Sequence, residues 1–331
     1  MSLTNCLSDY QLLTISLLPR VGRKTISEIV SNTSSRIDAN NDLYDALLGL
    51  EGKIKRFKSP DKSLFIKVVE ESKFIIEKLS KEGINLIGIG NEFYPNLLKC
   101  IPDPPVLLFY KGDIKPIIYK KTVAVIGTRE PSDYGKRWAE RLGAYIARRD
   151  IGVISGLALG CDSHGHIGAL NESGYTAAIL AHGLDKIFPA KNRELGNKIL
   201  NSGGCLISEY LPGTRPMKNY FIERNRIQSG LSCGIVIVES DNKGGSMHTA
   251  NFAQKQGRPI GCLQHPKKYS DFKSARGNVS LIEENKAIPI STENDLINFL
   301  NSIIDVKREN INDRDLSKHR KHQQVQLFEN L

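Results

Sequence analysis

The chain has 331 residues, of which 40% are hydrophobic, and its 46 Lys and Arg against 36 Asp and Glu give a formal net charge of +10. A chain of this length can bury more than one core, and its positive balance suggests a polyanionic partner. No apolar run approaches the roughly 18 residues of a membrane span, and the first residues lack the features of a secretory signal. The six scattered cysteines form no CxxC pair, which argues against zinc ribbons and disulfide scaffolds and favours a reducing, cytoplasmic setting.

Residues 1–100 are expected to form a small all-α N-terminal domain. Apolar residues recur at helical spacing on both sides of a turn at residues 19–22, and again over residues 64–79. The proline-rich stretch that follows predicts a linker over residues 101–121.

From residue 122 onward, short apolar runs alternate with helical patterns. The predicted strands lie at residues 123–126, 152–155, 177–181, 205–208, 235–239 and 259–263, and helices are predicted at 134–149, 162–171, 224–231 and 249–256. Strict alternation of this kind predicts an α/β domain with a parallel sheet covered by helices on both faces. We place this domain at 122–304 and expect a polar tail at 305–331.

The excess of positive charge lies in the predicted sheet domain. Residues 115–149 hold 9 basic and 3 acidic residues, residues 186–226 hold 8 and 3, and residues 240–276 hold 7 and 2. Two interpretations stay open. The blocks are either an ordinary solvated surface, or three basic segments that converge on one face.

Small residues follow several predicted strands. In an open parallel sheet, ligands bind outside the carboxyl ends of the strands, where small residues let backbone N–H groups approach an anion. A planar guanidinium at such an end suits phosphate. Each glycine alone is explained by a tight turn, but four such ends with one arginine favour a phosphate or nucleotide pocket. The residues at these ends are Gly127, Thr128 and Arg129, Ser155 and Gly156, residues 183–185, and Gly245 and Ser246.

No dinucleotide fingerprint and no P-loop is present, so neither NAD nor a P-loop nucleotide is expected, and we predict no cofactor. Asp162 and His166 are four residues apart on a predicted helix and share a face. They suit an acid–base pair, but the favoured interpretation is that they hydrogen-bond to each other and to loop backbone and hold the pocket wall. His164 and His166 face apart, so no metal site is predicted.

Two further basic segments are candidates for phosphate contacts. Arg224, Asn225 and Arg226 are predicted to open a helix, where two arginines suit an extended phosphate chain. Lys191 and Asn192 form a similar basic turn. Beside these charges lie two aromatic residues, Tyr220 and Phe221. They would stack on bases or, as is more common for aromatic residues, pack in the core.

Taken in order, these segments resemble the DprA/Smf family of DNA-processing proteins, over residues 123–266. The carrying segments are VIGTR at 125–129, SGLALGCD at 155–162, SEY at 208–210, RNRI at 224–227 and GS at 245–246. The resemblance implies an extended Rossmann-like domain that binds single-stranded DNA over a positive pocket. It also implies delivery of the strand to a RecA-type recombinase during DNA uptake and recombination, a homodimer, and no established catalytic reaction.

The resemblance also implies roles for single residues. Arg129, Lys191, Arg224 and Arg226 match positions that contact DNA in the family. Asp162, His166 and Glu209 are expected to support the pocket. The segment 18–25 looks like a helix-hairpin-helix turn, where Arg23 and Lys24 would assist backbone N–H groups at a phosphate, and a plain packing turn is an equal alternative.

Several positions depart from the family pattern. Ile222 and Glu223 stand where a proline and often a basic residue are expected, and Glu223 weakens the local positive field. His248 interrupts the family's G-S-L-I-T-A segment, and the tail is too short for the winged helix of many members.

Two other functions use the same pocket. One is a nucleotide sensor that acts through a partner. The other is a phosphoribohydrolase-like enzyme, but its PGGxGTxxE pattern is only echoed at residues 244–249, and Phe252 stands where its glutamate belongs.

Overall fold

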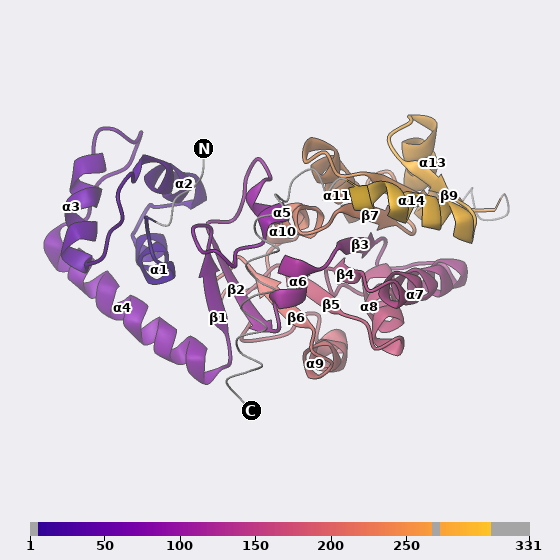
Figure 1. Cartoon of the computed structure of the whole chain (residues 1–331), viewed down its shortest axis with the longest axis horizontal. Helices are drawn as coiled ribbons and strands as arrows, with labels where there is room; N and C mark the ends of the chain where they lie inside the picture. Colours follow the sequence, from indigo (N-terminus) through magenta and orange to yellow (C-terminus); the bar gives the residue numbers. More distant parts are fainter. Residues whose placement is uncertain (1–5, 267–271, 306–331) are drawn as a thin grey trace, which may run out of the picture.

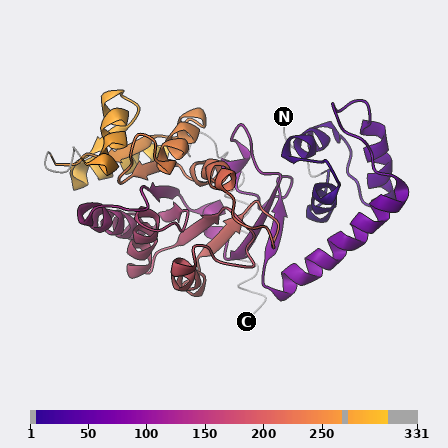
Figure 2. The same cartoon turned by 180° about the vertical axis from the view of Figure 1, so that it is seen from behind.

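The computed structural model describes residues 6–266 and 272–305. The predicted tail at 305–331 therefore lies almost wholly outside the described residues. The N-terminal helices are α1 (Asp9–Leu17), α2 (Arg23–Asn32), α3 (Asn40–Leu50) and α4 (Lys62–Lys81), and the predicted helical spacing covers α1, α2 and α4. Figures 1 and 2 show these helices at one end of the molecule, with α4 along its outer side.

Within the described ranges the strands form one nine-stranded sheet in the order β1-β2-β6-β5-β4-β3-β7-β8-β9. Seven neighbouring strands from β6 to β9 run parallel, whereas β2 pairs antiparallel with β6 and β1 pairs antiparallel with β2. The predicted parallel-rich α/β sheet is confirmed. The strands are β1 (Asn85–Gly88), β2 (Leu107–Gly112), β3 (Thr122–Ile126), β4 (Gly152–Ser155), β5 (Thr176–Leu180), β6 (Cys205–Ser208), β7 (Gly234–Ile237), β8 (Ile260–Leu263) and β9 (Ile288–Ile290).

Helices cover both faces of this sheet. Side chains alternate along β3, so Val123 and Val125 pack with helices α7 (Asp133–Arg148) and α14 (Glu293–Asp305). Ala124 and Ile126 join the core beneath α10 (Lys218–Gly230) and α11 (Gly245–Lys255). The remaining helices are α5 (Asn96–Lys99), α6 (Lys115–Tyr119), α8 (Cys161–Asn171), η1 (Ala190–Asn192), α9 (Arg193–Asn201), η2 (Lys273–Ala275) and α13 (Arg276–Glu283). No helix in residues 6–266 and 272–305 has the length and apolarity to cross a bilayer.

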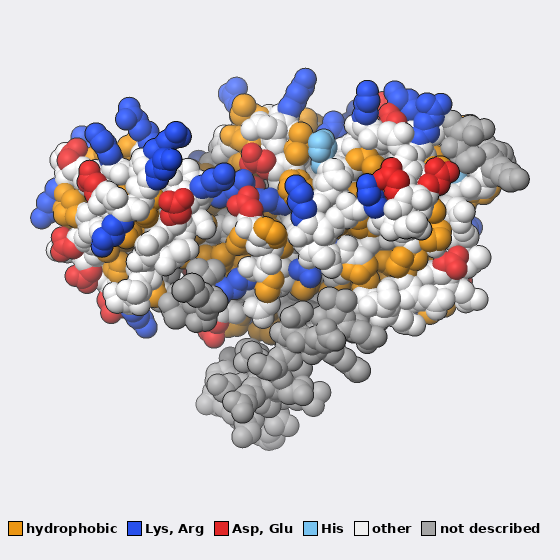
Figure 3. Space-filling model, turned by 90° about the horizontal axis from the view of Figure 1, so that it is seen from above, with side chains coloured by type: hydrophobic (Ala, Val, Ile, Leu, Met, Phe, Trp, Pro, Cys, Tyr) orange, Lys and Arg blue, Asp and Glu red, His pale blue; other side chains and the backbone are white. Residues whose placement is uncertain are grey.

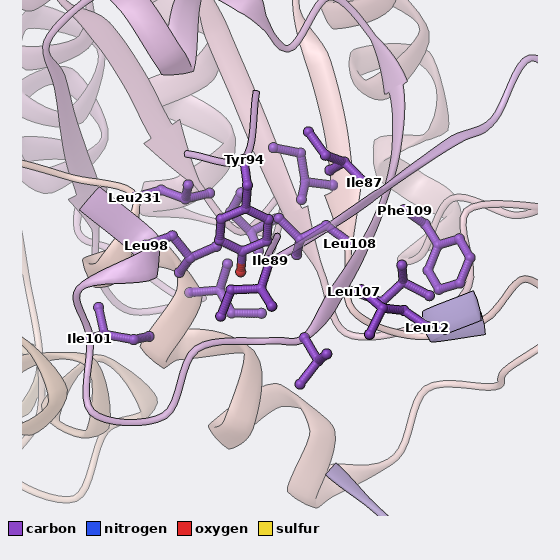
Figure 4. Packing of buried hydrophobic residues seen from close by; sticks show 14 of the residues in the cluster. Leu12, Ile87, Ile89, Tyr94, Leu98, Ile101, Leu107, Leu108, Phe109 and Leu231 are labelled. Atoms are coloured by element: carbon purple, nitrogen blue, oxygen red, sulfur yellow. The ribbon is translucent and has the colours of Figure 1, made fainter. Parts of the chain in front are cut away.

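The boundary between the helical and sheet regions differs from the prediction. Strand β1 falls inside the predicted helical domain, and β2 and α6 fall inside the predicted linker at 101–121. The reason is that residues 107–112 form a strand that pairs with β1 on one side and β6 on the other, and the apolar side chains of residues 107–109 are buried. Figure 4 shows Leu12 of α1 beside Leu107 and Phe109, so one hydrophobic core continues from the N-terminal helices into the sheet.

The topology reverses at β3. This strand lies between β4, the next parallel strand in the chain, and β7, which is reached only after β5 and β6. Connections therefore diverge from the carboxyl ends of β3 and β7, and the crevice that they leave is the usual ligand position in an open α/β sheet.

Helices α7 and α8 approach so closely that glycines are required between them. A Cβ on Gly168 would lie 2.0 Å from the Glu140 carbonyl oxygen, and a Cβ on Gly143 would lie 2.2 Å from the Gly165 carbonyl oxygen. Both obstacles are helix backbone, which cannot move without separating the helices.

We predict that Gly168→Ala lowers the free energy of unfolding by about 1–3 kcal/mol, because the added methyl group overpacks the α7–α8 contact. Urea denaturation followed by the fluorescence of Trp138 on α7 measures it. The matched control is Gly49→Ala on α3, where a Cβ meets nothing within 4 Å. That change should stabilise its helix by up to about 1 kcal/mol. Equal stability of Gly168→Ala and the wild type would contradict the packing argument.

Candidate functional site

A pocket of about 520 Å³ opens at the crevice between the carboxyl ends of β3 and β7. Its walls are the loop after β3, the loop after β7 with the first turn of α11, and one face of α10. Positive groups outnumber negative ones in this lining, so the pocket suits an anion. Its charged lining residues are Arg129, Lys218, Arg224 and Lys243 against Asp162 and Asp241.

The loop after β3 is fixed by close backbone contact with the segment that follows β7. The Thr128 N–H donates to the Glu239 carbonyl oxygen at 2.7 Å. A Cβ on Gly127 would lie 2.5 Å from the Cys161 sulfur and 2.8 Å from that same carbonyl oxygen, so only glycine fits there. This contact holds Thr128 and Arg129 at the mouth of the pocket.

Helix α11 presents an open N-terminus to the pocket. It begins at Gly245, four residues before the predicted start, and its N-cap Gly244 offers no side-chain hydrogen bond. Nothing lies within 4 Å of a Cβ built on Gly245. Ser246 is held by a bond from its hydroxyl to the Ser240 hydroxyl at 2.9 Å. Backbone N–H groups and the positive end of a helix dipole are therefore available to an anion.

The other helix N-terminus at this crevice is already occupied. The Glu239 side chain is 1% exposed, and its carboxylate accepts from the Ser132 N–H at 2.9 Å and from the Ser132 hydroxyl at 2.5 Å. Ser132 is the N-cap of α7, so an internal carboxylate fills the position where Rossmann folds place a nucleotide phosphate. An external anion is thereby directed to α11.

Aromatic residues stand beside the positive rim. Arg129 is exposed, and its guanidinium carbon lies 5.3 Å from the ring centroid of Phe221, a cation–π distance. Phe221 in turn lies 6.2 Å from Phe188, centroid to centroid. Phe221 therefore lines the pocket rather than the core, whereas Tyr220 stacks on Tyr210 at 4.3 Å on another side of α10.

The prediction that Arg224 opens a helix is wrong. Helix α10 begins at Lys218, so residues 218–223 are helical as well. The prediction missed them because these mixed polar and aromatic residues give no clear apolar period. Arg224 is 4% exposed, and its Nη1 donates to the Gly156 carbonyl oxygen at 2.8 Å and to the Ile179 carbonyl oxygen. Burial lowers the pKa of Arg224 to about 10, against the opposing charge of Asp162. Arg224 thus ties two strand ends together and forms part of the pocket floor.

Asp162 supports the same floor. Its Oδ2 accepts from the Gly156 N–H at 3.0 Å and the Ala158 N–H at 3.4 Å. Burial raises the pKa of the Asp162 carboxyl, and the Arg224 guanidinium partly offsets this. The predicted role of Asp162 in holding the wall through loop backbone agrees with these bonds.

His166 and Ser155 lie beneath the pocket, outside its lining. The His166 ring bonds the Thr176 hydroxyl at 2.6 Å rather than Asp162, so the suggested acid–base pair does not form. The buried Ser155 hydroxyl donates to the Val125 carbonyl oxygen at 2.7 Å. Ser155 therefore connects β4 to β3, and His166 connects α8 to β5.

The second basic turn is split between the surface and the interior. Asn192 is buried, and its amide donates to the Leu157 carbonyl oxygen at 2.8 Å and to the Ser163 hydroxyl at 2.9 Å. Asn192 therefore ties loops together. Lys191 is exposed beside it and is not part of the pocket lining, so its contact with a ligand stays a prediction.

Arg226, Glu209 and Arg23 are brought together, but away from the pocket. Arg226 is 3% exposed and makes a bidentate pair with Glu209, at 3.1 and 2.6 Å. Burial alone would lower the pKa of Arg226, but the Glu209 and Asp103 carboxylates outweigh it and raise that pKa. Arg23 lies 3.6 Å from the same Glu209. Lys24, the other predicted N-terminal contact, is exposed next to Arg23.

The structure therefore gathers about half of the predicted site and adds residues that sequence reasoning missed. Among the predicted residues, Asn225 links α10 to α11 through a bond from its amide to the Gly245 carbonyl oxygen at 3.2 Å. Lys243 carried a usable signal, since it directly precedes the small residues after β7. The predicted residues in the lining are Gly127, Thr128, Arg129, Asp162, Arg224, Asn225, Gly245 and Ser246, and the missed ones include Lys218, Gln228, Ser240, Asp241, Lys243 and His248. In residues 6–266 and 272–305, no group of three His, Cys, Asp or Glu side chains suits a metal ion.

Comparison with known proteins gives a family match. Residues 85–301 match the family described as DNA recombination-mediator protein A. The DNA processing protein DprA of Bacillus subtilis is 38% identical over 186 residues, which are 56% of this chain and 62% of that protein. The match thus covers less than two thirds of that relative.

Two solved structures are also similar. The X-ray structure of DprA from Streptococcus pneumoniae has a TM-score of 0.68 and 27% identity over 88% of this chain and 97% of that chain. A structure of Helicobacter pylori DprA that concerns its single-stranded DNA binding mode has a TM-score of 0.59 and 31% identity, over 66% of this chain and 96% of that chain.

The buried His166 makes stability depend on pH. Burial lowers its pKa to about 3 from 6.5. Well above pH 6.5 the ring is neutral in both the folded and unfolded states. As the pH falls below 6.5, the unfolded chain takes up a proton that the folded chain refuses, so the unfolding free energy falls by up to about 1.4 kcal/mol per pH unit.

We predict that His166→Gln, which cannot titrate, shows a shallower loss of unfolding free energy between pH 6.5 and 4.5 than the wild type. Urea denaturation at a series of pH values measures both slopes. The residual slope belongs to other groups, which include His182 and His265, whose pKa values burial also lowers. Parallel slopes for the two proteins would contradict the assignment.

Proposed function

The chain belongs to the DNA recombination-mediator protein A family, and from that premise we propose that it binds single-stranded DNA in the pocket between β3 and β7. One observation carries the proposal. An open helix N-terminus, exposed cations and an aromatic ring line the same pocket, and these are the groups that recognise phosphates and unpaired bases.

Each part of the pocket has a role in this proposal. A phosphate lies against the N–H groups of Gly245 and Ser246, and Arg129, Lys218 and Lys243 neutralise it and its neighbours. The base beside that phosphate stacks on Phe221. Arg224 supplies charge from below without leaving its carbonyl partners. Lys191 is proposed as a contact farther along the strand.

The strand extends beyond the pocket over a basic surface. Figure 3 shows Lys and Arg side chains that project along one edge of the molecule, from the end with the N-terminal helices to the end with the sheet. Such a row offers the counter-charges that a phosphate backbone needs at several successive positions.

We also propose that the chain hands the strand to a RecA-type recombinase, that it acts as a homodimer in DNA uptake and recombination, and that it works in the cytosol. The family resemblance supports these roles, and the six scattered cysteines, which form no CxxC pair, suit a reducing compartment. Light scattering measures the oligomer. Faster assembly of recombinase filaments on DNA coated with single-strand binding protein would support the delivery step, and an unchanged rate would contradict it.

We predict that Arg129→Ala lowers the affinity for a fluorescent oligo-dT by about tenfold to a hundredfold, because a charge-assisted phosphate contact is lost. The slope of log K against log salt should decrease by about 0.7, the value of one phosphate contact on a single strand. Fluorescence anisotropy over a salt series measures both. The control Arg141→Ala removes an equal exposed charge from α7 and should bind like the wild type.

We predict a different signature for Phe221→Leu. Loss of stacking should weaken oligo-dT binding by about 1–3 kcal/mol per base while the salt slope stays that of the wild type. A changed slope with unchanged affinity at low salt would contradict the stacking role. The same assay, with AMP or dTMP as competitor, tests the alternative of a nucleotide sensor. If a mononucleotide at micromolar concentration displaces the DNA, the pocket is that of a nucleotide sensor. If incubation with AMP releases free adenine, the protein is a phosphoribohydrolase-like enzyme.

A further inference from the structure

A ring of ion pairs joins the N-terminal helices to α10 on the side away from the pocket. Arg23, the first residue of α2, lies 2.9 Å from Asp103, 3.6 Å from Glu209 and 3.3 Å from Glu223. Arg226 bonds Glu209 at 2.6 Å and Asp103 at 3.4 Å. Asp103 and Glu209 therefore each bridge the two arginines, and the ring closes through four elements of the fold.

Helix α10 carries this ring and the pocket on different faces. At 3.6 residues per turn, Phe221, Asn225 and Gln228 fall on one face, and these residues line the pocket. Glu223 and Arg226 fall on the opposite face and belong to the ring. The body of one helix separates them, which is about 10 Å and close to the Debye length at physiological salt. The position of α10 and the charge on its far face therefore both bear on the pocket.

The charges of the ring do not balance. Two arginines face three carboxylates, of which Glu209 is buried while Asp103 and Glu223 are partly exposed, with 48% and 41% of their side chains in contact with solvent. Glu223 also directly follows Ile222, which lines the pocket. A carboxylate in this position repels a phosphate chain that passes over the rim. Arg23 is the cation that offsets it, and it comes from a different region of the chain.

We propose that Arg23 is a positioning residue for the DNA pocket: it holds α10 against the N-terminal helices and offsets the carboxylates behind the pocket, so that the N-terminal region sets the affinity for single-stranded DNA. This inference rests on the proposed function. It replaces the expectation that Arg23 itself meets a phosphate, because its guanidinium is engaged by three carboxylates.

The salt dependence separates the two roles of Arg23. A residue that contacts phosphate contributes to counterion release, and its loss lowers the slope of log K against log salt. A residue that acts through α10 changes the affinity and leaves that slope as it was. Removing the Glu223 carboxylate should then compensate for the loss of Arg23. If Arg23 instead contacted a phosphate directly, removing Glu223 would not restore the lost contact.

The test compares Arg23→Ala, Arg23→Lys, Glu223→Gln and the double variant Arg23→Ala with Glu223→Gln, by anisotropy with oligo-dT over a salt series. Arg23→Ala should weaken binding by about two- to tenfold with the wild-type salt slope. Arg23→Lys should recover part of the loss, and the double variant should bind more tightly than Arg23→Ala. The control Arg36→Ala removes an equal charge from the same region, where Arg36 pairs with Asp38 in an exposed bridge, and should bind like the wild type.

The outcomes are distinct. If the wild type fails to bind oligo-dT, the proposed function fails and not this inference alone. If the wild type binds and Arg23→Ala binds equally well, or loses affinity together with about 0.7 of salt slope, the positioning role is overturned. If Arg23→Ala does not fold by circular dichroism, Glu223→Gln decides: tighter binding than the wild type supports the inference, and unchanged binding overturns it.

Discussion

The Arg226 guanidinium must remain paired with Glu209, because both side chains are almost fully removed from water. A buried pair adds little net stability, but removing one partner leaves an uncompensated charge at a cost of about 3–5 kcal/mol. The pair therefore fixes where α10 lies relative to the end of β6. Since α10 is a wall of the pocket, this internal constraint decides whether Arg129, Phe221 and the N-terminus of α11 face one another.

The two helix N-termini at the crevice show how the fold selects its ligand. In an ordinary Rossmann domain the helix after the first strand binds a nucleotide pyrophosphate. Here Glu239 satisfies that helix from within, and the loop after β7 leaves α11 open instead. A phosphate bound at α11 lies beside Phe221 and an exposed basic edge, which suits one unit of a chain more than a compact dinucleotide.

Sequence reasoning predicted the sheet, the pocket and two of the four cations that line it, but not which arginines are held by internal partners. Apolar runs ended by small residues mark buried strands, so β3 to β8 and their loops follow from local pattern. An arginine gives no such signal, because its role depends on a partner elsewhere in the chain. Arg226 pairs with Glu209 and Arg23 with Glu223, 17 and 200 residues away. Arg224 is predicted from the sequence to contact a phosphate at the surface, but in the structure it is buried and donates to two backbone carbonyl oxygens.

The antiparallel extension of the sheet makes the N-terminal region inseparable from the rest. Strand β2 covers the edge of β6, and Leu12 of α1 packs so closely on β1 that a Cβ on Gly88 would lie 2.4 Å from its methyl carbon. Cutting the chain before β3, where composition alone suggests a boundary, would bare β6 as an unprotected edge beside exposed core residues. Such a fragment would pair edge to edge and aggregate. The smallest unit that can fold, and so be exchanged between proteins, therefore includes β1 and β2.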